Sequence, residues 1–342
     1  MRKPSMPSSL TTAAVRTGGI KNFWGTLKSV SVRAIAQEAE RPVSIAIVGP
    51  SEERAALAAK LLEHSGARRL IAPTESQKAV HQYDTLGEAA RVSPAADITI
   101  DLSNNPMAAE ARGSHFNVVQ LGGWPNTLHR ILDERPELAL ALARRFPAFR
   151  PHVVAAIIAD TAAVNAQFAL LTGIAEAIPF SAILLPVNSI SDMVVLTKNQ
   201  VMMVMKLAAA NGLTVDFRRR SSELGPVLAN GFGWRAIARE LVGAVPFVGF
   251  LARASIAYAG TVTVGKGAQY YYENGAAPSS DVLRSVYQDA LKASQGTVQA
   301  LAARIRAKRG QQPRRRGLTE VRVHGEPRAI EAAPPPEQSD SH

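Results

Sequence analysis

The turn around Gly49 is the first place in the chain where a phosphate-binding site could lie. An apolar, β-branched run ending at Val48 predicts a buried strand, and a helix is predicted directly after the turn. A phosphate-binding loop at such a junction needs a second glycine for the turn, then a lysine for the β- and γ-phosphates and a serine or threonine for magnesium. Counted from Gly49, these places hold Arg54, Ala55 and Ala56. We therefore expect an ordinary strand-to-helix turn, with Gly49 and Arg54 kept as candidates for binding an anion at the helix start.

Asp101 ends a second predicted strand and is the third candidate for nucleotide chemistry. A GTPase would use an aspartate here to hold magnesium and a glycine shortly after it to bond the γ-phosphate, but the chain reads Asp-Leu-Ser-Asn. After the next predicted strand, the guanine-reading Asn-Lys-x-Asp is replaced by Gly-Gly-Trp-Pro at residues 122–125. Every nucleotide motif is thus incomplete, so we predict no catalytic residue and no cofactor.

Metal and nucleophile chemistry find little support in the composition. The chain has no cysteine, which excludes disulfides and thiolate ligands. Its seven histidines show no metal-ligand spacing, and no Ser/His/Asp set can be assembled from their order. The N-terminus lacks the continuous apolar core of a signal peptide, so a cytoplasmic location is expected.

The stretch from Leu241 to Tyr272 is the most apolar part of the chain and carries one charge, Arg253, before Lys266. It exceeds the roughly 20 apolar residues that cross a hydrocarbon core, but a cation at mid-bilayer costs about 2.5–3.5 kcal/mol. We therefore predict a hairpin that turns at residues 246–249, although its small residues also suit a tight soluble bundle. The predicted membrane-contact residues are Phe247, Phe250, Leu251, Arg253, Ile256 and Lys266.

The net charge of +11 is concentrated at the two ends of the chain. Residues 1–33 hold six basic side chains and no acid, and residues 304–328 hold nine against two acids. Near an anionic leaflet each basic side chain contributes on the order of 1 kcal/mol. Nucleic acid would satisfy the same charges, and a solvated tail that only keeps the protein soluble needs no partner.

The predicted elements divide the chain into four parts. Residues 1–18 form a flexible arm, and residues 306–342 form a basic, then proline-rich, disordered tail. Residues 19–135 combine an N-terminal helix with a small parallel α/β sheet, and residues 136–305 show only helical patterns. The predicted strands are 43–48, 69–72, 97–102 and 117–121. The predicted later helices are 138–146, 152–178, 191–211, 234–245, 251–272 and 281–305.

The helical half carries a distinctive set of positions: Asn165, Pro179, Pro186, 192–197, Gln200, Gly212, Pro246, Gly249, Gly260, Thr261, Gly265, Tyr271 and 273–275. In this pattern it resembles a known bacterial family, the domain of unknown function 697, over about residues 150–275. That resemblance implies a membrane-associated helical domain that follows an Era-like small GTPase domain. The fold class would then be α/β plus all-α, with residues 43–135 resembling a degenerate P-loop GTPase domain.

We therefore predict a non-catalytic adaptor or regulatory protein on the cytoplasmic face of the cell membrane. Its expected partners are an anionic membrane surface and a second protein, for which a companion GTPase is one candidate; small residues and a methionine stripe permit an oligomer. One alternative is an atypical GTP-binding protein or GTPase that uses Gly49, Arg54 and Asp101 with GTP and magnesium. A second alternative is a soluble nucleic-acid-binding protein that acts through its basic tail, although the tail has no aromatic residue to stack on bases.

Overall fold

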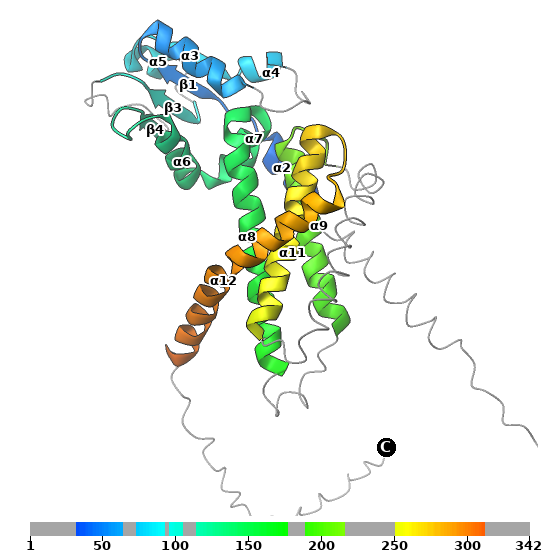
Figure 1. Ribbon diagram of the computed structural model, residues 1–342. Helices are drawn as coiled ribbons and strands as arrows, with labels where there is room; N and C mark the ends of the chain where they lie inside the picture. The colour runs from blue at the N-terminus through cyan, green and yellow to red at the C-terminus, as the bar shows by residue number, and fades with distance from the viewer. Residues whose placement is uncertain are drawn as a thin grey trace, which may run out of the picture. The chain divides into compact units, whose positions relative to one another are not determined.

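The computed structural model describes residues 32–63, 73–92, 96–104, 114–176, 189–215 and 250–311. In this part of the chain, four short strands form one parallel sheet, and most other residues lie in helices (Figure 1). The coarse prediction of a small parallel α/β sheet followed by a helical half is confirmed. Outside the described residues lie the predicted arm, the strand at 69–72, the helix at 234–245, the corner at 246–249 and the tail beyond residue 311.

The sheet has the order β2-β1-β3-β4, and all neighbouring strands run parallel. Its register places Tyr83, Val48, Asp101 and Asn117 in one row at the carboxyl ends of the four strands. This is a doubly wound order, in which ligands bind outside the carboxyl ends near the point where the order reverses. The strands are β1 (Ile45–Val48), β2 (Val80–Tyr83), β3 (Ile98–Asp101) and β4 (Ser114–Asn117).

Alternate residues of β1 face two different cores because successive side chains of a strand point to opposite faces. Ile45 and Ile47 belong to the cluster that contains α3, α6 and α7, whereas Ala46 and Val48 pack with α5 and Tyr83. Helices therefore cover both faces of the sheet. These helices are α3 (Ser51–Leu62), α4 (Pro73–Gln77), α5 (Leu86–Val92), α6 (Trp124–Glu134) and α7 (Ala139–Arg145).

Two strands differ from the sequence-based prediction. Strand β2 was not predicted, because as an edge strand it buries only Tyr83 and reads as a polar segment. Strand β4 ends at Asn117, where the predicted strand 117–121 begins. The reason is local: the Asn117 side chain accepts the Gln120 backbone N–H at 3.0 Å, which turns the chain directly after the strand.

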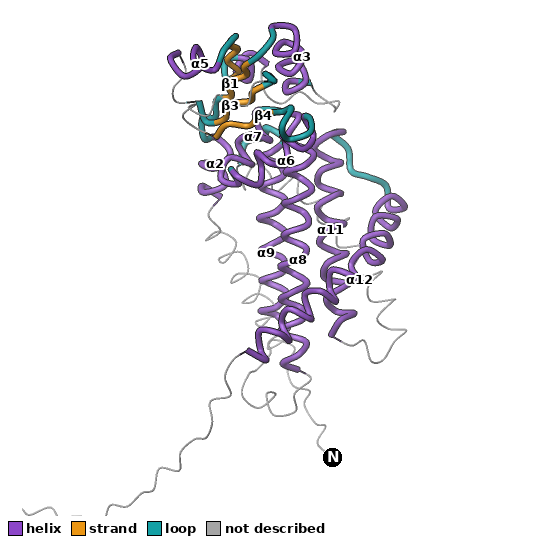
Figure 2. The backbone as a smooth tube through the Cα atoms, turned by 90° about the vertical axis from the view of Figure 1, so that its left-hand side faces the viewer, coloured by secondary structure: helices purple, strands orange, loops and turns teal. Residues whose placement is uncertain are grey.

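The helical half contains three long helices that share one core, with a fourth packed against it. α8 (Arg150–Glu176) runs antiparallel to α9 (Ser189–Ala210) and α11 (Phe250–Asn274), and α12 (Ser280–Gln311) follows (Figure 2). These helices match four predicted ones to within a few residues, and α12 extends into the predicted tail as far as Gln311. Of the predicted N-terminal helix, only α2 (Val32–Glu40) is described.

A buried hydrogen-bond network joins the three long helices at one level of the bundle. Asn165 of α8 donates to the Thr261 hydroxyl of α11 at 2.9 Å and accepts from Asn199 of α9 at 2.8 Å. Gln200 also donates to Thr261, at 3.3 Å. Asn165 and Thr261 are fully buried, so any sliding or rotation of one helix would leave polar groups without hydrogen-bond partners in an apolar core. The network therefore fixes the register of the bundle.

Arginines near α7 connect the sheet to the bundle. Arg145 donates to the Val43 carbonyl oxygen before β1 at 3.2 Å. Arg144 donates to the Ala209 carbonyl oxygen at 3.2 Å, and Arg150 donates to that of Ala210 at 2.9 Å. The last carbonyls of a helix have no partner within the helix. Arg144 and Arg150 thus cap the carboxyl end of α9, a role that no local sequence pattern predicted.

His152 makes the stability of this region sensitive to pH. Its ring centroid lies 4.7 Å from that of His129 on α6, and burial together with that neighbour lowers the pKa of His152 from its ordinary value of 6.5. The unfolded chain therefore binds more protons than the folded chain between the lowered pKa and 6.5. This contribution to stability is complete above that window and is lost as the pH falls through it.

We expect the melting temperature of the protein to fall between about pH 7.5 and pH 5.5, and to fall less in the His152→Gln variant, which has no imidazole to protonate. Thermal denaturation of both proteins across this range measures the difference. Equal losses in the two proteins would show that His152 is not responsible.

Candidate functional site

Arg54, a candidate for anion binding, instead bonds to groups of the protein around the turn. Its Nη1 donates to the Gly49 carbonyl oxygen at 2.7 Å and pairs with the Asp84 carboxylate, and its side chain is only 12% exposed. Gly49 has a φ of +136°, and a Cβ at this position would lie 2.8 Å from the Cβ of Leu102. Leu102 therefore packs directly against the turn, and both anion candidates serve the structure of the turn itself.

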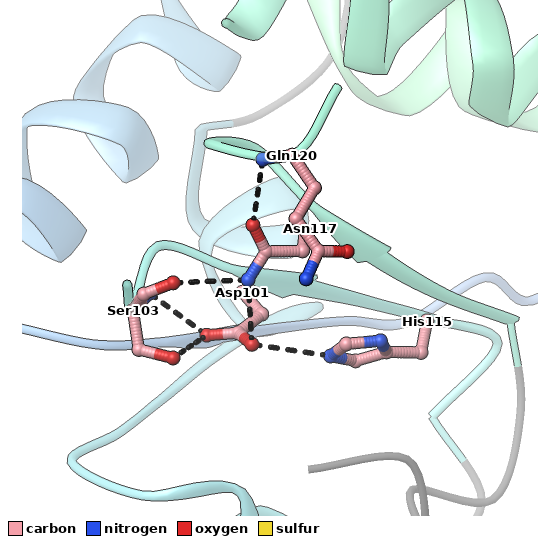
Figure 3. A network of polar contacts seen from close by, with 5 residues as sticks. All are labelled: Asp101, Ser103, His115, Asn117 and Gln120. Atoms are coloured by element: carbon pink, nitrogen blue, oxygen red, sulfur yellow. Dashed lines mark hydrogen bonds and ion pairs between the residues drawn. The ribbon is translucent and has the colours of Figure 1, made fainter. Parts of the chain in front are cut away.

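Asp101 is fully buried at the end of β3 and is surrounded by donors from the chain. Its Oδ1 accepts the Ser103 backbone N–H at 2.8 Å and the Ser103 hydroxyl at 2.7 Å. Its Oδ2 accepts the Asn117 side-chain amide at 3.0 Å and lies 3.3 Å from His115 Nε2 (Figure 3). Both carboxyl oxygens are thus occupied, and the contacts join the ends of β3 and β4.

This arrangement does not have the order of a nucleophilic relay. In such a relay a serine donates to a histidine, which an acid then orients. Here Ser103 and His115 both face Asp101, so the serine is not next to the base. A magnesium ion bound to Asp101 would compete with Ser103 and Asn117 for the carboxylate oxygens. Each donor left unpaired would cost about 1–3 kcal/mol of stability. Among the described residues, no group of three His, Asp or Glu side chains is placed to hold a metal.

Sequence reasoning identified Asp101 but missed its partners Ser103, His115 and Asn117. One signal was available: Asp101 and Asn117 each end a strand of the same parallel sheet, and such ends meet at one edge. The predicted strand 117–121 placed Asn117 at the start of a strand instead of its end, so the proximity of Asn117 to Asp101 was not predicted.

The structure does not bring the predicted membrane-contact residues together at one place. Phe247 lies outside the described residues, and Phe250 begins α11. Leu251 and Arg253 are exposed and Ile256 is half-buried, all within the first two turns of α11. Lys266 is exposed too, but it lies 15 residues beyond Leu251, or about 22 Å along the helix axis.

Exposed apolar side chains gather at the end of the bundle where α8 ends and α9 and α11 begin. Leu171, Val195 and Leu251 are 40%, 36% and 36% exposed. Counted from the buried Asn165 network, they lie roughly 7–15 Å further toward this end, at 1.5 Å per residue. We call these three residues the apolar end. The sequence joining α8 to α9, residues 177–188, and the sequence entering α11, residues 241–249, contain no charged residue.

Within the described residues, one helical segment is long and apolar enough to cross a membrane. It is Pro147–Thr172, which includes most of α8, and 44% of its most apolar window is buried inside the protein. The core helix of a soluble protein passes the same test, so the segment is weak evidence for a span. The sequence favours residues 241–272 for membrane contact, because polar residues interrupt the earlier apolar run: Asp160, Asn165, Gln167 and Glu176.

Comparison of the chain with protein-family models, with curated proteins and with solved structures finds no match. The resemblance of residues 150–275 to the domain of unknown function 697 stays a prediction from the sequence.

Proposed function

We propose that this chain is a non-catalytic adaptor that attaches to the cytoplasmic face of a membrane through its apolar end. The observation that carries the proposal is the exposure of Leu171, Val195 and Leu251 on three helices at one end of the bundle. Removing a leucine side chain from water contributes about 1.5–3 kcal/mol. Leu171, Val195 and Leu251 are 36–40% exposed, so each would gain part of this free energy in an apolar environment, and the connecting sequences 177–188 and 241–249 contain no charge to oppose it.

The charges of the chain support an anionic surface as the partner. Arg253 is exposed and lies two residues from Leu251, at the level where head groups would meet the apolar end. The basic residues at both chain ends add attraction that salt weakens, because exposed charges are screened over about 10 Å at 0.1 M salt. The non-catalytic part of the proposal is supported by the sheet edge, where Arg54 and Asp101 are bonded within the chain.

Sedimentation with vesicles tests the membrane proposal. We expect the full-length protein to pellet with vesicles rich in phosphatidylglycerol, and the double variant Leu171→Glu/Leu251→Glu to bind at least about tenfold more weakly, since two charges would enter the apolar layer. The control is Val92→Glu, which introduces one glutamate at a 66% exposed valine of α5, and each single variant, Leu171→Glu and Leu251→Glu, is its match in charge.

Binding that persists in high salt but is lost in the double variant would identify the apolar end as the attachment site. A wild-type protein that stays in the supernatant with acidic vesicles would overturn the membrane proposal. Saturable binding of GTP and magnesium to the full-length protein would overturn the non-catalytic part and favour the GTP-binding alternative.

A further inference from the structure

A groove between α8, α11 and α12 lies away from the apolar end. It consists of two adjoining cavities of about 390 Å³ and 350 Å³, which share Ala155, Ile158, Lys266 and Val286. The three helices that line it are labelled in Figure 2. Each cavity lies within the roughly 300–1,000 Å³ of small-molecule sites, and the shared residues make the two cavities one continuous groove.

The walls of the groove are apolar, and a small residue, Ala155, leaves space between them. Val154 and Ile158 line one side, and Val282 and Val286 of α12 line the other. Ala155 faces the space between them without filling it. A wall of this kind suits an alkyl chain, because burying apolar surface is the main source of affinity where few polar groups are available.

Lys266 is the cation that lines both cavities, and it makes no ion pair with any described residue. Two acids also line the groove. Glu273, in the first cavity, accepts a hydrogen bond from Gln269 at 2.6 Å, and its charge acts on Arg150, whose pKa it raises against the effect of burial. Asp289, in the second cavity, is exposed on α12. Neither Lys266 nor Asp289 makes an ion pair with a described residue, and the ammonium group of Lys266 is the positive charge that the groove offers to an anion.

We propose that this groove binds a long-chain fatty acid, with the alkyl chain between α8 and α12 and the carboxylate paired with Lys266. The ligand is a free acid because Lys266, which would pair with its head group, lies about 22 Å along α11 from Leu251, too far for a head group whose chain stays in a bilayer at the apolar end. The proposal is independent of membrane attachment. The Lys266 ammonium assigns the head group, the hydrogen bond from Gln269 to Glu273 leaves Asp289 as its competitor, and the apolar walls assign the tail.

A fluorescence titration of the full-length protein with cis-parinaric acid, a naturally fluorescent fatty acid, tests this site without vesicles. We expect saturable binding that weakens about tenfold in Lys266→Gln, the loss of one charge-assisted contact. Asp289→Asn removes the competing acid and should tighten binding about twofold. Ala155→Trp should abolish binding by filling the groove, whereas Ala156→Trp, at an exposed neighbour that does not line the groove, should leave it unchanged.

No saturable binding by the wild-type protein would overturn the proposal. Binding that Ala155→Trp removes but Lys266→Gln leaves intact would also overturn it, because the groove would then hold the alkyl chain without pairing its carboxylate with Lys266. The double variant Leu171→Glu/Leu251→Glu should bind the fatty acid normally, which separates failure at this groove from failure at the apolar end.

Discussion

Replacing Asp101 with alanine is expected to lower the free energy of unfolding by about 3–5 kcal/mol. The substitution removes the carboxylate that accepts both Ser103 donors, and it removes one of two acceptors of the Asn117 amide, which also donates to the Ser103 carbonyl oxygen at 2.9 Å. Each buried donor left without a partner costs about 1–3 kcal/mol. A urea titration with an unchanged denaturant slope would measure the loss as a shift of the midpoint.

Two further variants make this prediction specific. Asp133→Ala changes an exposed aspartate of α6 and should alter stability by no more than about 0.5 kcal/mol. Asp101→Asn keeps one acceptor for Ser103 but turns an amide donor toward Asn117, so a smaller loss of about 2 kcal/mol is expected. A loss below about 1 kcal/mol in Asp101→Ala would mean that the network does not brace the strand ends.

Replacing Gly265 with leucine is expected to cost about 3 kcal/mol by forcing α8 and α11 apart. A Cβ at this position would lie 2.7 Å from Cγ1 of Ile158 and 3.1 Å from its two other outer carbons, so rotation of Ile158 does not make room. Overpacking of a closed core typically costs about 1–3 kcal/mol, and a side chain as long as leucine requires the helices to move. Thermal and urea denaturation measure the change.

Gly296 provides the matched control within α12. A Cβ there would meet nothing within 4 Å, so Gly296→Leu should be neutral or should raise stability by up to about 1 kcal/mol through helix propensity. The same substitution is thus expected to have opposite effects in two helices. Similar effects at both positions would show that close packing at Gly265 does not hold α8 and α11 together.

The sequence by itself determined the elements with strong local patterns. The β-branched runs before Gly49 and Asp101 predicted β1 and β3, because a strand buried on both faces reads as a continuous apolar run. The long apolar segments bounded by proline and glycine predicted α8, α9, α11 and α12. These signals are local, since each depends only on residues a few positions apart.

Only the tertiary structure decided how the candidate residues are used. Arg54 could serve a phosphate or a carboxylate, and it is Asp84, 30 residues away, that takes its charge. Asn165 and Thr261 are 96 residues apart, and no local pattern around either residue predicts their hydrogen bond. Lys266 was grouped with Leu251 because both lie in one apolar stretch, and the straight course of α11 separates them. Long-range pairing depends on which helix faces come together, which the packing of the whole core determines and no local period encodes.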